Sequence, residues 1–232
     1  MNFLSARWEH LLLANYVVDP AVLQPFVPMG TKLDAFDGQV YVSLVAFLFN
    51  RMSIAGIPIP FHQSFEEVNL RFYVAPDKDP SIRAVTFIKE IVPKASIPFI
   101  SNTLFHENYV TLPMDHCNED KHHSYSWMNK VKNSISATIE SELTLPANNS
   151  ISEFITEHYW GYAKAPNYTL EYEVRHPQWN CCEVTQYEIN VDYAINYGKE
   201  FSFLNDQQPH NVLYAQGSPV SVLYPSRLQQ PK

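Results

Sequence analysis

The sequence contains little glycine: 6 of its 232 residues are glycine, whereas 17 are proline. No glycine-rich segment is present. The phosphate-binding loops of dinucleotide-binding and P-loop proteins need such segments, because their backbone must approach the phosphates closely. The sequence therefore excludes these two classes of nucleotide-binding fold, and we predict no bound cofactor.

Clusters of lysine and arginine are also missing. The chain has 16 basic and 24 acidic residues, and its net charge is −8 at pH 7. Nucleic acids and anionic membranes are bound by clustered cations, so this composition argues against both as partners.

Long apolar runs and a disulfide pattern are absent as well. The segment MNFLSARWEHLLLANYVV is interrupted by an arginine, a glutamate and a histidine, so it lacks the shape of a signal peptide. No stretch approaches the ~20 apolar residues of a membrane helix. The three cysteines (Cys117, Cys181 and Cys182) form no even framework. We therefore predict a cytoplasmic protein with reduced thiols, and the role of the adjacent cysteine pair stays open.

The chain does contain many strand-like segments, and 46% of its residues are hydrophobic, which is typical of a folded protein. The segment TKLDAFDGQVYVSLVAFLF predicts two strands joined by a turn at Asp37-Gly38. The second of these strands is apolar on both faces, which predicts a central, buried strand. Further strands are predicted at 64–74, 82–92, about 100–112, 134–143, 168–176, 182–193 and 220–225.

Two helices are predicted beside these strands. Asp19-Pro20 has the pattern of an N-cap followed by proline at the first helical position, and Ser150 with Glu153 forms a capping box before a longer helix. We predict a single domain over residues 1–232 that is mainly β (α+β), with an antiparallel, closed or nearly closed β-barrel and about two helices.

Residues 64–74, SFEEVNLRFYV, place a row of polar side chains on one face of a predicted strand. Glu67, Asn69 and Arg71 stand at alternate positions, and Tyr73 follows them on the same face. Two explanations stay open. The row is either a solvated sheet face with an ion pair worth less than about 1 kcal/mol, or the lining of a cavity. Because the preceding strand is apolar on both faces, we expect this strand to be covered, which favours the cavity.

Two further candidates lie at strand ends. Lys94 follows Pro93 after an apolar strand, where burial would lower the pKa of a lysine and make it a nucleophile; a surface lysine is the commoner outcome. His176 continues the face of an aromatic stripe, and Trp179 is expected to close over the same end. The alternative for His176 is a core histidine that is hydrogen-bonded to backbone.

Residues 115–123 gather aspartate, glutamate, histidine and cysteine in one segment, within MDHCNEDKHH. Their spacing matches no standard structural zinc site, and the segment is expected to be a polar hairpin loop. We therefore predict no metal site.

Five sequence blocks follow one another along the chain: WEHLLLANYVVDPAVLQPFVP, LDAFDGQVYVSLVAF, SFEEVNLRFYV, FITEHYWGY and HPQW. With these blocks, from about Trp8 to Tyr224, the chain resembles the YqjF-like family of bacterial proteins, a domain of unknown function. The resemblance implies a single domain of the acetoacetate decarboxylase-like superfold, an antiparallel β architecture around a cone-shaped cavity. It also implies that Glu67, Asn69 and Arg71 belong to the polar lining of that cavity.

Acetoacetate decarboxylases use a Schiff-base lysine that follows a proline and lies beside a second lysine. In the segment ENYVTLPM the proline falls on Pro113 and the nucleophile position on Met114, whose thioether cannot form an imine. The upstream Arg-Glu pair of that motif falls on Glu107 and Asn108. The resemblance therefore does not carry the decarboxylase chemistry to this chain.

Two functions stay open at this point. In the first, the cavity binds a small, partly apolar molecule with a carboxylate or carbonyl group, and Arg71 pairs with the anion. In the second, the protein is a decarboxylase- or aldolase-like enzyme for a small keto acid or ketone, with Glu67 as acid/base and Lys94 as imine former. A general acid/base needs a raised pKa, whereas the positive charge of Arg71 beside Glu67 lowers the pKa of that carboxyl. The identity of the ligand and the oligomeric state stay open, a homo-oligomer included. The residues predicted to bind the ligand are Glu67, Asn69, Arg71, Tyr73, His176 and Trp179, with Phe47 as a further wall residue.

Overall fold

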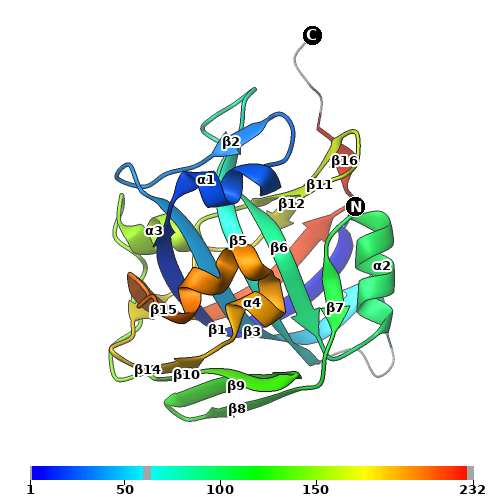
Figure 1. Ribbon diagram of the computed structural model, residues 1–232. Coiled ribbons are helices and arrows are strands. Elements are labelled where there is room, and N and C mark those ends of the chain that lie inside the picture. Colours follow the sequence, from blue (N-terminus) through cyan, green and yellow to red (C-terminus); the bar gives the residue numbers. More distant parts are fainter. Residues whose placement is uncertain (1, 60–63, 229–232) are drawn as a thin grey trace.

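The structure, a computed structural model, describes residues 2–59 and 64–228, and strands are its dominant element (Figure 1). The strands are β1 (Asn2–Val18), β2 (Thr31–Leu33), β3 (Val40–Ile54), β4 (Ile57–Pro58), β5 (Phe65–Pro76), β6 (Ala84–Val92), β7 (Tyr109–Thr111), β8 (Met114–Glu119), β9 (His122–Asn129), β10 (Val131–Thr138), β11 (Trp160–Lys164), β12 (Thr169–Arg175), β13 (Cys181–Glu183), β14 (Gln186–Asn190), β15 (Asn211–Leu223) and β16 (Ser226–Arg227). The α-helices are α1 (Pro20–Leu23), α2 (Ser96–Leu104), α3 (Ile151–Thr156) and α4 (Tyr193–Tyr197), and the 3-10 helices are η1 (Gln24–Phe26) and η2 (Lys199–Asn205).

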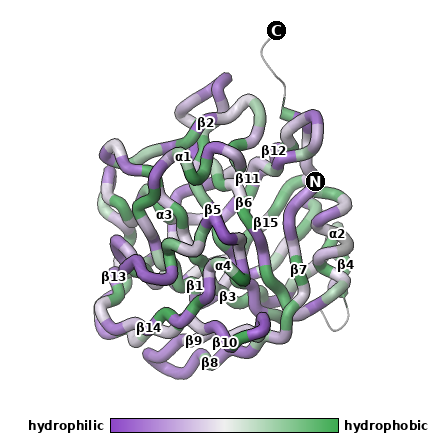
Figure 2. Tube along the Cα trace, viewed as in Figure 1, coloured by the Kyte–Doolittle hydropathy of each residue, from purple (hydrophilic) through white to green (hydrophobic). Residues whose placement is uncertain are grey.

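Seven strands close into a ring in the order β15-β1-β3-β5-β6-β11-β12, because β12 pairs back with β15. Neighbouring strands of the ring are antiparallel except β6 and β11, which are parallel and pair through only two residues of each strand. A separate four-stranded sheet, β14-β10-β9-β8, lies against the ring (Figure 1). Its outermost hairpin, β8 and β9, is mainly hydrophilic (Figure 2). The predicted mainly β, closed architecture is confirmed.

Both faces of the ring strands are buried, each in a different core. In β5, Val68, Leu70 and Phe72 pack into a core that also contains residues of the four-stranded sheet and of α4. The alternate side chains of the same strand, such as Phe65 and Tyr73, belong to a second core on the inner side of the ring. This double burial explains why long segments of these strands are apolar on both faces.

The central strand and the turn before it form as predicted, whereas one pairing differs. Residues 40–49 of β3 are all buried, and the strand pairs with both β1 and β5. Asp37 and Gly38 have positive φ angles of 49° and 75°, and Phe36 and Gln39 exchange backbone hydrogen bonds across the turn. However, β2 pairs with β5 rather than with β3, so the two segments do not form a simple hairpin.

The strand predicted at about 100–112 is wrong over most of its length. Residues Ser96–Leu104 form α2, and only Tyr109–Thr111 are a strand. Pro98 stands in the first turn of α2, where a proline costs no intrahelical hydrogen bond, so it permits a helix here.

Ser150 caps the start of α3 as predicted, whereas the Glu153 side chain bonds to the residue before the cap rather than to the cap itself. The Ser150 hydroxyl accepts a hydrogen bond from the Glu153 amide at 3.1 Å, and the Glu153 carboxylate accepts one from the Asn149 amide at 2.6 Å. The helix ends after six residues, so it is shorter than predicted. In the described part of the chain helices form at five places, since η1 continues α1, and the prediction of about two helices is wrong. None of the described helices is long and apolar enough to cross a membrane.

Candidate functional site

A cavity lies inside the ring, and about 100 Å³ of it accepts the centre of a water molecule. One water molecule needs roughly 10–15 Å³ of such space, so the cavity has room for a small organic molecule. All seven ring strands contribute to its lining, and α2, β7 and the loops at 105–108 and 157–159 complete it. Most of the wall is apolar, with large contributions from Trp8, Phe47, Phe49, Phe87 and Phe105.

The polar row of β5 points into this cavity. Glu67, Asn69 and Arg71 all line it and are nearly fully buried, with exposed fractions of 3%, 2% and 7%. The strand alternation that the sequence displays therefore separates a polar inner face from an apolar outer one.

The Glu67 carboxylate receives two hydrogen bonds. The Asn69 side-chain amide donates to its Oε1 at 2.8 Å, and the Tyr109 hydroxyl donates to its Oε2 at 3.1 Å. Burial raises the pKa of Glu67 to about 7, although both hydrogen bonds and the charge of Arg71 act to lower it. Glu67 therefore titrates near neutral pH, as a general acid or base requires.

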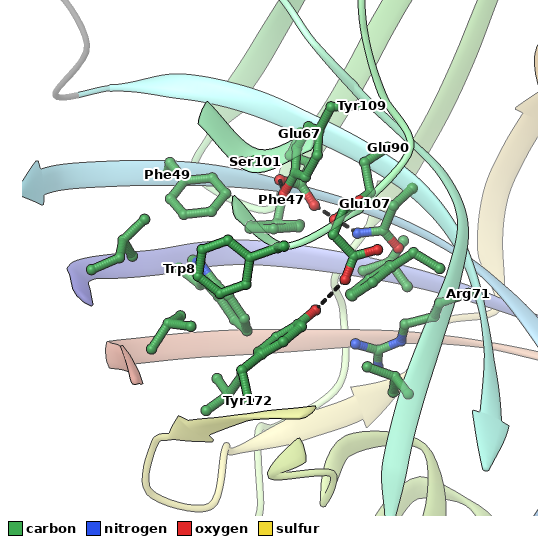
Figure 3. A pocket seen from close by; sticks show the side chains of 18 of the residues that line it. Trp8, Phe47, Phe49, Glu67, Arg71, Glu90, Ser101, Glu107, Tyr109 and Tyr172 are labelled. Atoms are coloured by element: carbon green, nitrogen blue, oxygen red, sulfur yellow. Dashed lines mark hydrogen bonds between the residues drawn. The ribbon is translucent and has the colours of Figure 1, made fainter. Parts of the chain in front are cut away.

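Two more carboxyl groups complete a cluster with Glu67 (Figure 3). Glu90 on β6 stands directly opposite Asn69 on β5, and burial together with the charges of Glu107 and Glu67 raises its pKa well above the usual range. Glu107 accepts a hydrogen bond from the Tyr172 hydroxyl at 2.6 Å, and burial and the charge of Glu67 raise its pKa to about 8. We call Glu67, Glu90 and Glu107 the carboxyl cluster. Because these like charges oppose one another's ionisation, Glu90 and Glu107 hold their protons at pH 7 and Glu67 holds its proton about half of the time.

Arg71 is the cationic group of the cavity lining. Its Nη2 donates to the backbone carbonyl of Ile155 at 3.1 Å, and its Nε has no hydrogen-bond partner. Within the described residues it forms no salt bridge. The nearby His158 ring is neutral, since burial and the charge of Arg71 hold its pKa well below the usual range. Arg71 is therefore a buried positive charge without a directly bonded anion.

Three residues predicted to bind the ligand pack behind the cavity wall instead of forming its surface. Tyr73 bonds through its hydroxyl to Ser43 at 2.6 Å. His176 stacks on the Trp179 ring, with 4.2 Å between ring centroids, and Trp179 donates to Ser218 at 2.8 Å. None of Tyr73, His176 and Trp179 is among the cavity-lining residues, because hydrogen bonds and ring stacking hold them in the surrounding layer.

Lys94 lies outside the cavity. With Pro93 and Met114 it lines a separate hollow, beside the ion pair of Glu66 and His116. The described lining of the cavity contains no lysine. The structure therefore does not bring Lys94 and Glu67 together.

The segment 115–123 forms strands β8 and β9 and the turn between them, rather than a simple loop. Among the described residues there is no group of three or more histidine, cysteine, aspartate or glutamate side chains placed to hold a metal ion.

Sequence reasoning missed Glu90, and a β-bulge explains why. Val85 and Phe87 line the cavity, so strict alternation along β6 would place Lys89 inside and Glu90 outside. Instead Leu70 pairs with Lys89 and Arg71 with Phe87, which leaves one extra residue in β6. The bulge turns Glu90 into the cavity, and no pattern in the sequence marks its position.

Glu107 and Tyr109 were also missed as lining residues. Glu107 lies between α2 and β7, and Tyr109 is the first residue of β7. A continuous strand was predicted over this part of the chain, so the side-chain alternation expected there gave no information about the lining.

The sequence matches the model of one protein family and is similar to a curated relative. The family is DUF2071, described as "Uncharacterized conserved protein (COG2071)", and its model matches residues 5–219. "Uncharacterized protein YqjF" from Bacillus subtilis (strain 168) is 26% identical over 192 residues, which cover 80% of this chain and 77% of that protein.

Solved structures share the fold at low sequence identity. The enduracididine biosynthesis enzyme MppR complexed with pyruvate has a TM-score of 0.69 and 12% identity, with 99% of this chain and 91% of that chain covered. Acetoacetate decarboxylase from Legionella pneumophila subsp. pneumophila str. Philadelphia 1 has a TM-score of 0.69 and 9% identity, with 99% and 90% covered. An acetoacetate decarboxylase-like enzyme from Sphingomonas wittichii RW1 has a TM-score of 0.66 and 14% identity, with 100% and 95% covered.

These likenesses establish the fold and leave the chemistry to the residues of the cavity. The family match covers most of the chain, and the closed ring around a cavity agrees with the architecture of the structural neighbours. The chain therefore belongs to the YqjF-like DUF2071 family of uncharacterised conserved proteins and has an acetoacetate decarboxylase-like fold.

Proposed function

We propose that the protein binds a small, partly apolar molecule in the ring cavity, and that this molecule bears a carboxylate or carbonyl group held by Arg71. The observation that carries the proposal is the guanidinium group of Arg71, which within the described residues is bonded to no carboxylate and has an Nε without a partner. Buried charges are retained in proteins when they are paired, because removal of an ion from water costs several kcal/mol. Arg71 is 7% exposed, and its Nε has no partner. An anionic or carbonyl group of a ligand supplies that partner.

The rest of the cavity suits the remainder of such a molecule. Aromatic side chains such as Trp8, Phe47 and Phe87 form an apolar wall, which favours a hydrocarbon part. The structural neighbour MppR was solved with pyruvate, a molecule that has both a carboxylate and a carbonyl group. This agrees with the proposed ligand class.

The test is calorimetric titration with pyruvate, 2-oxobutyrate, butyrate and 4-methylpentanoate. The wild type is expected to bind at least one of them, and Arg71→Met is expected to lose at least tenfold in affinity, since an apolar side chain cannot pair with the acid group. Arg71→Met should stay folded, because Arg71 forms no salt bridge within the described residues.

The matched control is Arg175→Met. Arg175 is exposed and paired with Glu173, so its removal should leave the affinity unchanged. Equal binding by wild type and Arg71→Met, or absence of binding by all four acids, contradicts the proposal.

A second candidate function is proton transfer by Glu67 at the carbon next to a substrate carbonyl. The observation in its favour is the pKa of Glu67, which burial raises to about 7. In this reaction the Glu67 carboxylate takes the proton from carbon, the electron pair forms the enolate, and the proton returns to carbon. Because Lys94 lies outside the cavity, this candidate proceeds without an imine.

The exchange of substrate hydrogen for deuterium tests this candidate. In D₂O, the methyl signal of pyruvate should disappear faster with wild-type protein than with Glu67→Gln, as followed by proton NMR. An exchange rate in the presence of wild type that equals the rate in buffer excludes the enzyme function for this substrate.

A further inference from the structure

Among the buried polar atoms of the described cavity lining that have no hydrogen-bond partner, which include the ring nitrogens of Trp8 and His158, two oxygens belong to neighbouring side chains. They are Oδ1 of Asn69 and Oε2 of Glu90, and both residues are 2% exposed. Asn69 and Glu90 are direct cross-strand neighbours on β5 and β6, and both line the cavity. Such neighbours have Cβ atoms about 5 Å apart, so one group between them can reach both side chains. Buried acceptors without a donor are rare in folded proteins, and this pair therefore points to a donor supplied by a ligand.

We propose that the ligand carries a protonated nitrogen as well as its acid group, so that the cavity accommodates a small amino acid or a related zwitterion. This inference rests on the proposed function, in which Arg71 holds the acid group. The nitrogen then lies at the carboxyl cluster, bonded to Asn69 and Glu90. The inference therefore narrows the class of ligand from a small acid or carbonyl compound to a small zwitterion.

The charges of the cavity support a zwitterion over a simple acid. Once an acid group neutralises Arg71, three carboxyl groups remain, and the described lining contains no lysine to pair with them. An ammonium group brings a positive charge and three N–H donors to this region. Because a nearby cation favours the ionised form of a carboxyl group, a carboxyl of the cluster that is protonated in the free protein gives up its proton when the ammonium group binds. The resulting carboxylate and the Asn69 side-chain oxygen then accept hydrogen bonds from the ammonium group.

The spacing along β5 agrees with a compact ligand. Arg71 and Asn69 stand two residues apart on the same face, which corresponds to about 7 Å along the strand. In Figure 3 the carboxyl groups of Glu67, Glu90 and Glu107 face a common space, and Arg71 lies at another side of the same cavity. The acid and the nitrogen of one small molecule can span this separation.

Pairs of compounds that differ only in the amino group test the inference. Calorimetric titration at pH 7.5 compares leucine with 4-methylpentanoate, and 5-aminopentanoate with pentanoate. We expect the amino compound of at least one pair to bind at least tenfold more tightly than its partner. Equal binding within both pairs, or tighter binding of both simple acids, overturns the inference and leaves the proposed function standing. Absence of binding by all four compounds overturns the inference, and the proposed function falls with it only if pyruvate, 2-oxobutyrate and butyrate also fail to bind.

Two variants, one at Glu90 and one at Glu66, test whether the nitrogen of the ligand lies beside Glu90. Glu90→Gln keeps the size of the side chain but cannot ionise to pair with an ammonium group, so the ratio between the affinities of the amino compound and the simple acid should fall at least tenfold. The matched control is Glu66→Gln, since Glu66 lies on the same sheet away from the cavity and pairs with His116. An advantage that survives unchanged in Glu90→Gln overturns the inference.

Discussion

At the scale of single residues, burial sets the charge of the cavity. A simple count gives three carboxyl groups against one guanidinium group, which suggests a negative site. Burial raises the pKa of Glu67 to about 7 and that of Glu107 to about 8, and it raises the pKa of Glu90 well above its usual range. At pH 7, Glu90 and Glu107 are therefore mainly protonated and Glu67 is about half protonated. Arg71 then carries the one full charge of the described lining, and the cavity attracts an acid in spite of its composition.

The carboxyl cluster predicts that the protein loses stability as the pH rises. Above about pH 4.5 these side chains ionise in the unfolded chain, whereas the folded protein keeps their protons. The folded state binds more protons in this range, so the free energy of unfolding decreases with increasing pH, through about pH 7 for Glu67 and about pH 8 for Glu107. Urea unfolding between pH 5 and pH 9 measures this decrease.

Replacement of Glu67 isolates its contribution to the pH dependence of the free energy of unfolding. Glu67→Gln cannot ionise, so the loss of stability between pH 5 and pH 9 should shrink by about 3 kcal/mol relative to the wild type. A wild-type free energy of unfolding that is constant or increases over this range contradicts the assignment of raised pKa values.

At the scale of secondary-structure elements, local patterns were predictable and pairing was not. The alternation in residues 64–74 correctly separates the inner from the outer face of β5, because a side-chain period of two follows from strand geometry alone. The turn at Asp37-Gly38 likewise follows from two residues that accept positive φ angles. The partner of β2 and the bulge in β6 depend on contacts between distant segments, which the local sequence does not record.

Position 161 on β11 needs glycine because the Tyr172 ring of β12 occupies the space that a side chain would fill. Gly161 is the cross-strand partner of Tyr172, and a Cβ atom at this position would lie 2.2 Å from Cζ of the ring. We predict that Gly161→Ala destabilises the protein by about 1–3 kcal/mol, because the ring must move away and loses its hydrogen bond to Glu107. Urea unfolding gives the free-energy change.

A double-mutant cycle provides the control. In a Tyr172→Leu background the added methyl group meets a smaller side chain, so Gly161→Ala should cost clearly less there. If Gly161→Ala lowers the free energy of unfolding equally in both backgrounds, contact with the tyrosine ring does not explain the glycine at this position.

At the scale of the whole molecule, the ring is joined weakly at two places. β11 pairs with β6 through Trp160 and Gly161, and β12 pairs with β15 through Val174 and Arg175. The hairpin of β11 and β12 is thus held to the rest of the ring by short ladders, although it supplies part of the cavity lining. Local opening is easiest where few hydrogen bonds must break.

Hydrogen exchange should show whether the hairpin of β11 and β12 opens more easily than the rest of the ring. We predict faster amide exchange in β11 and β12 than in β3, and slower exchange in the hairpin when a ligand fills the cavity, as measured by mass spectrometry. Equal protection of β3 and the hairpin, or no response of the hairpin to a bound acid, would contradict this description of the ring.

The fold and the chemistry of the cavity were not equally accessible from the sequence. The ordered sequence blocks correctly implied the ring, whereas the lining assembles from segments as distant as Trp8, Glu67, Glu107 and Tyr172. Structural neighbours with 9–14% identity share this fold. In this chain, however, the candidate imine-forming lysine, Lys94, lies outside the cavity. The identity of the lining residues, rather than the fold, therefore decides what the cavity binds.

A crystal structure of the wild type with its tightest-binding acid would show directly whether Arg71 holds the acid group inside the ring. We predict the ligand inside the ring, with an oxygen of its acid group about 2.7–3.1 Å from Nε of Arg71 and its hydrocarbon part against Phe47 and Phe87. A ligand bound elsewhere on the protein, or bound in the cavity with Nε of Arg71 still unpartnered, would contradict it.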